Sequence, residues 1–253
     1  DFWDTPGTAS GVALSEKQLY VASGELGLQS VDITAPGNFQ IEGTYPTTAR
    51  DLALVGNTAF ISTTSNSILS VDVSNPASPV LLDTLDLDGT HTPRGLIASG
   101  DYLFFAGGTS GIGAVDIGNP GAMELAGSAS QTSTVSELYV LGDYAYLAGS
   151  GGLQVFDVAQ PNSPEFVGFY DAYSTMLNVH VRGNVAYVTD SGYLIVPNVL
   201  HILDVSDPDT PVEIDTLYES VTGSTQLYDV IVRDQYAFFS DEYVAGGTGF
   251  VVV

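Results

Sequence analysis

Ser70-Val71-Asp72-Val73-Ser74-Asn75-Pro76 is the stretch that decides the fold, because a variant of it recurs along the chain. Each copy has a short, largely apolar run, an aspartate and a turn that contains proline. The aspartates of the other copies are Asp32, Asp116, Asp157 and Asp204, so successive aspartates lie 40, 44, 41 and 47 residues apart. A period of this size is typical of solenoids and propellers, and it governs how every other motif is interpreted.

A second phrase precedes each copy and has the form apolar-x-apolar-x-Gly-x-x-Ala-Tyr-apolar. It occurs at 52–61, 96–105, 138–147, 179–188 and 230–239, and in degenerate form at 12–21, where Ser15-Glu16-Lys17 replaces the glycine turn. Alternating apolar residues around a Gly, Asn or Asp pair predict a hairpin, because these residues tolerate the backbone angles of a tight turn. Each unit is therefore predicted to be strand, turn, strand, loop, strand with the aspartate, proline turn and strand.

The five aspartates of the first phrase are interpreted as structural. A carboxylate at this position can accept backbone N–H groups of the following turn, and proline fixes the φ angle of that turn.

The two phrases together resemble the LVIVD repeat family, whose consensus joins a Gly-x-x-Ala-Tyr-Val hairpin to Leu-Val-Ile-Val-Asp-Val-Ser-x-Pro. The resemblance covers nearly the whole chain. It implies a β-propeller of a bacterial or archaeal surface-associated protein, and it implies no catalytic residues.

The predicted fold is all-β: one domain over residues 1–253, a six-bladed β-propeller of four-stranded antiparallel blades. The repeats are expected at about 10–45, 50–87, 94–128, 135–170, 177–218 and 226–253. The last copy stops after its third strand, and Phe2-Trp3-Asp4 matches the end of a fourth strand, Phe169-Tyr170-Asp171. We expect residues 1–5 to complete the last blade, because closure removes open sheet edges. A short outer strand, or a natural chain that extends past one end, would account for the rest of that repeat.

The composition excludes several classes of function. The chain has 30 acidic and 5 basic residues, a formal charge of −25, and 44% hydrophobic residues, so it is expected to be globular and to repel nucleic acid and anionic lipid. Partners that fit are another protein chain or further copies of this one, a cationic partner, a divalent metal or a neutral glycan. The simpler explanation of the charge is solubility or adaptation to salt.

The compartment is inferred from composition alone. There are no cysteines, no apolar run of the ~20 residues that a membrane-spanning helix needs, and one lysine among many Gly, Ser, Thr and Asp residues. We expect a protein that is not membrane-spanning and that is extracellular or on the cell surface of a bacterium or archaeon. If the protein is exported, the sequence is a mature or trimmed form.

Candidate ligand-binding residues lie just before the innermost strands, because propeller loops of this kind gather at one mouth of the channel. They are Arg50, Asp51, Arg94, Glu137, Asn178, Tyr228 and Asp229. Two of the four arginines share one repeat position. They are expected either to pair with the neighbouring carboxylates and tie blades together, which is the simpler interpretation, or to form an anion or carbohydrate site.

Metal ligands are sparse. Asp86, Asp88 and His91 form the densest group, but the spacing differs from that of an EF-hand, so a solvated turn is the simpler interpretation and Ca²⁺ the only cofactor considered. His180 and His201 are interpreted as packed side chains, since no two histidines have a zinc-like spacing.

The preferred function is a non-enzymatic binding or assembly module that contacts protein or glycan through loops on one propeller face. The alternative is a propeller hydrolase or lyase at the channel mouth. The sequence has no Gly-x-Ser-x-Gly elbow, and neither the 107–111 nor the 149–152 glycine-rich loop is followed by a helix or a P-loop lysine.

Two loops depart from the repeat by insertion, at 189–199 and 240–249. Tyr193, Leu194 and Ile195 in the first and Tyr243 in the second are candidate interface residues, because apolar and aromatic anchors within a polar rim are typical of protein interfaces.

Overall fold

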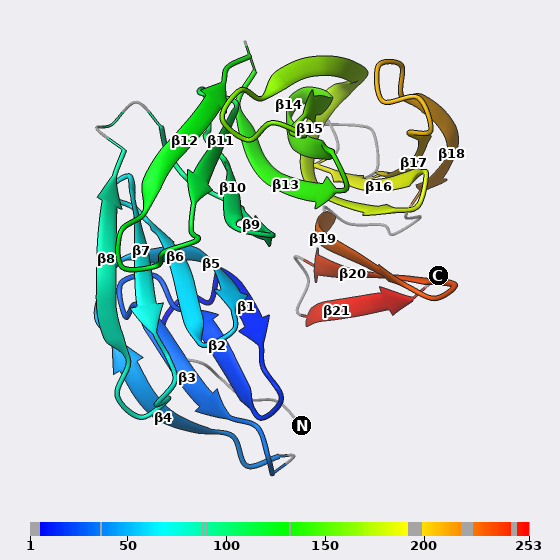
Figure 1. The fold of residues 1–253 in the computed structure, drawn as a ribbon. Helices are drawn as coiled ribbons and strands as arrows, with labels where there is room; N and C mark the ends of the chain where they lie inside the picture. Colours follow the sequence, from blue (N-terminus) through cyan, green and yellow to red (C-terminus); the bar gives the residue numbers. More distant parts are fainter. Residues whose placement is uncertain are drawn as a thin grey trace. The chain divides into compact units, whose positions relative to one another are not determined.

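The computed structural model describes residues 6–35, 37–87, 89, 91–131, 133–191, 199–218, 225–243 and 247–252. Within these residues every regular element is a β-strand, as predicted (Figure 1). The chain divides into two compact units, Asp1–Gly127 and Ser128–Val253, and each is described by itself.

The first compact unit contains three four-stranded sheets, in each of which every strand is hydrogen-bonded to the next along the chain. The first sheet contains β1 (Gly11–Leu14), β2 (Gln18–Ala22), β3 (Leu28–Asp32) and β4 (Gln40–Tyr45). The second contains β5 (Ala49–Val55), β6 (Thr58–Thr63), β7 (Ser67–Asp72) and β8 (Val80–Asp86). The third contains β9 (Leu96–Ser99), β10 (Tyr102–Ala106), β11 (Ile112–Asp116) and β12 (Glu124–Ala129).

The second compact unit contains a six-stranded sheet and a three-stranded sheet, again in chain order. The larger sheet contains β13 (Val135–Leu141), β14 (Tyr144–Asp157), β15 (Glu165–Arg182), β16 (Val185–Asp190), β17 (Val199–Asp204) and β18 (Val212–Tyr218). The smaller contains β19 (Thr225–Arg233), β20 (Tyr236–Tyr243) and β21 (Gly247–Val252). Residues 1–5, which were predicted to close the last blade, lie outside the described residues.

The six-stranded sheet differs from the prediction because β14 and β15 each join two expected strands. β15 has 18 residues; it pairs with β14 from Glu165 to Thr175 and with β16 from Met176 to Arg182. No proline or glycine occurs in residues 169–182, whereas Pro46 and Pro93 lie in the corresponding connections of the first compact unit. Without a residue that breaks the ladder, the fourth strand of one repeat continues into the first strand of the next.

The aspartates of the recurring phrase have the structural role that was predicted. In all five, Oδ1 accepts the backbone N–H two residues later, at 2.8–2.9 Å; the acceptors are Asp32, Asp72, Asp116, Asp157 and Asp204. This bond lowers the pKa of Asp72 below its ordinary value. The aspartate thus starts the turn that returns the chain into the fourth strand.

The apolar cores lie between consecutive sheets. Tyr20 and Leu28 of the first sheet pack with Ile61 and Val71 of the second in one buried cluster. A second cluster joins the second and third sheets, and a third joins the two repeats of the six-stranded sheet. Within each compact unit, consecutive repeats therefore pack through apolar faces, as propeller blades do.

Polar contacts at the proline turns join consecutive sheets as well. Ser30 Oγ donates to the Pro76 carbonyl, and Ser70 Oγ donates to the Pro120 carbonyl. The approach is close, since a Cβ atom at Gly43 would lie 2.1 Å from the Pro76 carbonyl oxygen. The turn of one repeat is thus held by the third and fourth strands of the preceding repeat.

Candidate binding site

A β-bulge lies at the start of the innermost strand of each repeat. In β5, Ala49 pairs with Thr63 and Asp51 with Ser62, so Arg50 is the extra residue. The register shifts in the same way in β13, β15 and β19. A bulge places two residues of one strand opposite a single residue of the partner strand, and it turns a side chain out of the ordinary alternation between the two faces of the sheet.

The remaining two repeats show the same two-against-one pattern in their hydrogen bonds. Arg94 N donates to the Ala106 carbonyl at 2.9 Å, and Ala106 N donates to the Gly95 carbonyl at 3.1 Å. Ser10 N likewise donates to the carbonyl of Ala22, the register partner of Gly11. The first residues of the bulge pairs are chemically diverse: Ser10, Arg50, Arg94, Ser136, Leu177 and Tyr228.

Hydroxyl side chains of two repeats tie the bulge region to the next repeat. Ser62 Oγ accepts Asp51 N at 3.1 Å and donates to the Arg94 carbonyl at 3.0 Å. Asp51 Oδ2 accepts Leu96 N at 2.7 Å. In the second compact unit, Thr189 Oγ1 makes the equivalent bond to the Tyr228 carbonyl at 3.5 Å. Asp51 therefore holds β5 against β9, a role that the sequence did not reveal.

The expectation that the two arginines pair with carboxylates is wrong for the described part of the chain. The ion pairs among the described residues involve His201, and neither Arg50 nor Arg94 forms one there. Arg50 is half-buried, and its Nη1 is buried without a hydrogen-bond partner among the described residues, whereas Arg94 is exposed. Burial, and then the charge of Arg94, lower the pKa of Arg50. The bulges bring two cations together where pairing was expected.

The other candidate residues belong to the second compact unit. Glu137 and Asn178 follow the bulge residues of β13 and β15 and are half-buried, and Tyr228 is 43% exposed. Asp229 is exposed as a residue, but partial desolvation of its carboxyl raises its pKa. The hydrogen bond from Val230 N–H and the charge of His180 lower that pKa and so oppose the shift. The structure thus places each of these residues at a bulged strand end, whereas the repeat alignment placed them just before the strand and predicted no bulge.

Of the residues considered for calcium, Asp86 and His91 are among the described residues. Asp86 is exposed at the end of β8, while His91 is buried edge-on against Phe105, with ring centroids 5.7 Å apart. Burial lowers the pKa of His91. No group of three metal-ligating side chains occurs among the described residues, and Asp88 lies outside them. Calcium binding stays a prediction.

Most of the candidate interface residues fall outside the described part of the chain. Tyr193, Leu194 and Ile195 lie in the undescribed segment 192–198, and Tyr243 is described only as the last backbone position of β20. None of the described segments forms a helix long and apolar enough to span a membrane.

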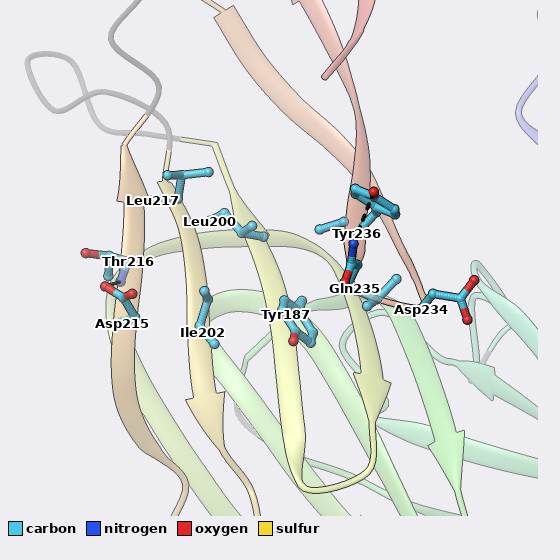
Figure 2. Close-up of a pocket in the computed structure, with 11 residues that line it drawn as sticks. Tyr187, Leu200, Ile202, Asp215, Thr216, Leu217, Asp234, Gln235 and Tyr236 are labelled. Carbon is cyan, nitrogen blue, oxygen red and sulfur yellow. Dashed lines mark hydrogen bonds between the residues drawn. The ribbon is translucent and has the colours of Figure 1, made fainter. Parts of the chain in front are cut away.

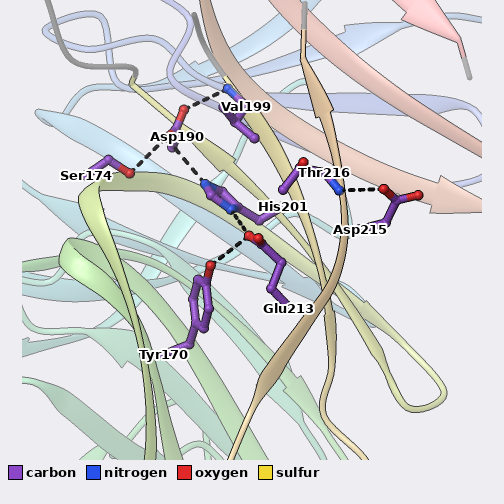
Figure 3. Close-up of polar contacts among 8 residues, drawn as sticks. All are labelled: Tyr170, Ser174, Asp190, Val199, His201, Glu213, Asp215 and Thr216. Carbon is purple, nitrogen blue, oxygen red and sulfur yellow. Dashed lines mark hydrogen bonds and ion pairs between the residues drawn. The ribbon is translucent and has the colours of Figure 1, made fainter. Parts of the chain in front are cut away.

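A polar cluster around the buried residues His201 and Asp190 was not predicted (Figure 3). His201 Nδ1 lies 2.6 Å from Glu213 Oε2, and Nε2 lies 3.4 Å from Asp190 Oδ2. Two residues of β15 also donate to these carboxylates: Ser174 to Asp190 at 2.8 Å, and Tyr170 to Glu213 at 2.7 Å. Burial opposes protonation, but the bonds and charges of Asp190 and Glu213 raise the pKa of His201 above its ordinary value.

This cluster ties β15, β16, β17 and β18 together. Asp190 also accepts Val199 N at 2.8 Å and so joins both ends of the inserted loop. A sequence signal existed, because Glu213 occupies a position that is apolar in the other repeats, as in Leu81 and Phe166.

A cavity of about 250 Å³ lies between the outer strands of the fifth repeat and the β19–β20 turn (Figure 2). Tyr187, Leu200, Leu217 and Asp215 line it. The corresponding residues of the second repeat, Phe60, Ile68, Leu85 and Asp83, face the third repeat; the first three pack in one core with Met123, and Asp83 accepts Met123 N at 2.7 Å. The described residues of the last repeat supply no counterpart of Met123 beside the cavity.

Comparison with known proteins supports the repeat assignment. A family model described as LVIVD repeat matches residues 6–47, 48–86, 93–130, 134–172 and 176–217. No curated protein matches the sequence.

Two solved structures illustrate the fold. The Cps50 (Swd1) β-propeller domain of Myceliophteria thermophila aligns with a TM-score of 0.72 at 12% identity, covering 97% of this chain and 83% of that one. The computationally designed Ika8 protein aligns with a TM-score of 0.70 at 11% identity, covering 97% of this chain and 71% of that one. At these identities the similarity is one of fold alone.

Proposed function

Because the chain belongs to the LVIVD repeat family and has the fold of β-propeller repeats, we propose that it is a non-enzymatic protein-binding module that acts through the bulged ends of its innermost strands. The observation that carries the proposal is the contrast within each repeat. The strand positions after the bulge repeat as apolar residues, whereas the bulge itself holds serine, arginine, leucine or tyrosine. A rigid scaffold with variable side chains at one set of strand ends suits recognition.

The propeller is proposed to have six blades, with the last one completed by residues 1–5. Val12 and Leu14 of β1 are 63% and 67% exposed, whereas Leu52, which corresponds to Val12 in the second repeat, is 4% exposed. Such exposed apolar residues on a first strand favour coverage by another blade, at ~25 cal/mol per Å² of apolar surface removed from water. A glycan remains the second class of ligand.

We place the protein outside the cell or on its surface, on composition alone. Its charge of −25 favours a neutral or basic partner, because long-range repulsion slows association with acidic proteins.

The test compares two triple variants that change opposite ends of the same innermost strands. The bulge-end variant carries Arg50→Ala, Arg94→Ala and Tyr228→Ala. The turn-end variant carries Asn57→Ala, Asp101→Ala and Gln235→Ala, all exposed turn positions. Partners are cross-linked in the secreted fraction of the source culture, purified, and measured by interferometry.

We expect the bulge-end variant to weaken binding by about tenfold or more and the turn-end variant by less than about twofold, since few residues carry most of the energy of an interface. Equal affinities of both variants, or a larger loss in the turn-end variant, would contradict the proposal.

A further inference from the structure

The bulges of the second and third repeats hold Arg50 and Arg94 in a fixed relationship. The Arg94 carbonyl accepts Ser62 Oγ, and Leu96 N donates to the carboxylate of Asp51, the residue after Arg50. These two hydrogen bonds therefore fix the backbones of the two bulge regions relative to each other, and each region carries one of the two guanidinium groups. This geometry lies entirely within the first compact unit.

Within the described part of the chain, the arginine pair lacks acceptors of its own. Arg50 Nη1 is buried and has no hydrogen-bond partner among the described residues, and neither arginine forms an ion pair there. This is notable in a chain with 30 acidic and only 5 basic residues. An unpaired buried donor costs folding free energy, and adjacent like charges add to that cost, so an added acceptor would be stabilising.

A glycine-rich loop keeps the approach to Arg94 open. Gly108 has a φ of 65°, in the left-handed region. A Cβ atom there would lie 3.9 Å from Arg94 Nε and 3.5 Å from Thr92 Cβ. Glycine thus satisfies the backbone conformation and leaves the space beside the guanidinium free of a side chain.

We propose that Arg50 and Arg94 form a binding site for one carboxylate group, which a protein partner presents. The inference rests on the proposed function and names the chemistry that this end of the sheets recognises. A guanidinium fork matches the two oxygens of a carboxylate, and the second arginine supplies further donors. The negative field of the whole chain repels a phosphate dianion more strongly than a singly charged carboxylate. The partner therefore carries its carboxylate on a neutral or basic surface.

The test uses acetate as the probe and the Nε–Hε resonances of the arginines, followed by NMR in the intact protein. We expect a saturable shift of the Arg50 and Arg94 signals and weaker binding of inorganic phosphate. Arg94→Gln, at an exposed position, and Arg50→Lys, which keeps the charge but loses the fork, are each expected to weaken acetate binding by about tenfold. The matched control is Arg182→Gln, at an exposed position in the second compact unit, for which we expect no change in acetate binding.

Thermal melting confirms that each variant is folded, and Arg94→Gln alone decides the question if Arg50→Lys fails to fold. The proposal is overturned if acetate produces no saturable shift, if Arg182→Gln weakens binding as much, or if phosphate binds more tightly than acetate. If acetate binds as expected but the bulge-end variant retains its partner, the proposed function fails and the carboxylate site stands.

Discussion

Ser62 donates its hydroxyl hydrogen to the carbonyl oxygen of Arg94 at 3.0 Å and so joins the second strand of one repeat to the bulge of the next. The same hydroxyl accepts Asp51 N. One buried side chain thus satisfies two backbone groups on different strands.

We therefore expect Ser62→Ala to lower the free energy of unfolding by about 1–3 kcal/mol, because both backbone groups lose a partner in a buried place. Chemical denaturation measures the change. The matched control is Ser78→Ala, at an exposed turn position, with a change within ~0.5 kcal/mol. Equal midpoints for the two variants would show that the hydroxyl does not tie the repeats.

The cluster around His201 predicts a pH dependence of stability. The folded-state pKa of His201 is raised above the ordinary value near ~6.5, so its contribution is fully present below that value and is lost as the pH rises through the folded-state pKa. The melting temperature should fall over this interval from acid to alkaline, and His201→Gln should flatten that fall. His180→Gln is the control, because burial lowers the pKa of His180. A wild-type curve that rises across the interval would refute this assignment.

The cavity in the second compact unit predicts unequal effects of two truncations. Met123 is 5% exposed and belongs to the core between the second and third sheets, whereas Leu217 is 38% exposed beside the cavity. Met123→Ala should cost about 2–5 kcal/mol of unfolding free energy and Leu217→Ala under ~1 kcal/mol. Comparable losses, measured by denaturation, would mean that the cavity is filled in solution.

The inserted loop at 189–199 predicts self-association or partner binding from its composition. Replacing Leu194 and Ile195 by serine should reduce association in sedimentation experiments while leaving the melting temperature unchanged, because apolar residues that a partner covers stabilise the interface rather than the monomer. A lower melting temperature in a protein that is monomeric throughout would instead place these residues in the core of the monomer.

The repeat chemistry made most of the fold predictable. The recurring aspartate and the glycine hairpin are local features, since the turn that each needs is formed by residues close in sequence. This is why all five aspartate turns, and the four-stranded sheets of the first compact unit, agree with the prediction. The fusion of strands in β15 was missed because it depends on the lack of a breaking residue, and the recurring phrases do not cover that connection.

The sequence predicted where the residues of the candidate site lie, but not whether its arginines pair with carboxylates. The repeat alignment placed Arg50 and Arg94 at equivalent strand ends. Whether they meet a carboxylate depends on how neighbouring sheets pack, and Asp51 bonds to Leu96 N instead. The contacts of His201 with Asp190 and Glu213 bring together residues 11 and 12 positions apart through β-sheet pairing, which sequence spacing alone does not encode.

The bulges at the inner strands are held by main-chain hydrogen bonds, as between Arg94 and Ala106, and in some repeats also by a hydroxyl on the adjacent strand, as at Ser62. At Arg50 and Arg94 the side chain of the extra residue takes no part in these bonds. Mutation can therefore exchange the residue without disturbing the sheet, so that binding specificity can drift from one descendant protein to another while the strands around it stay the same.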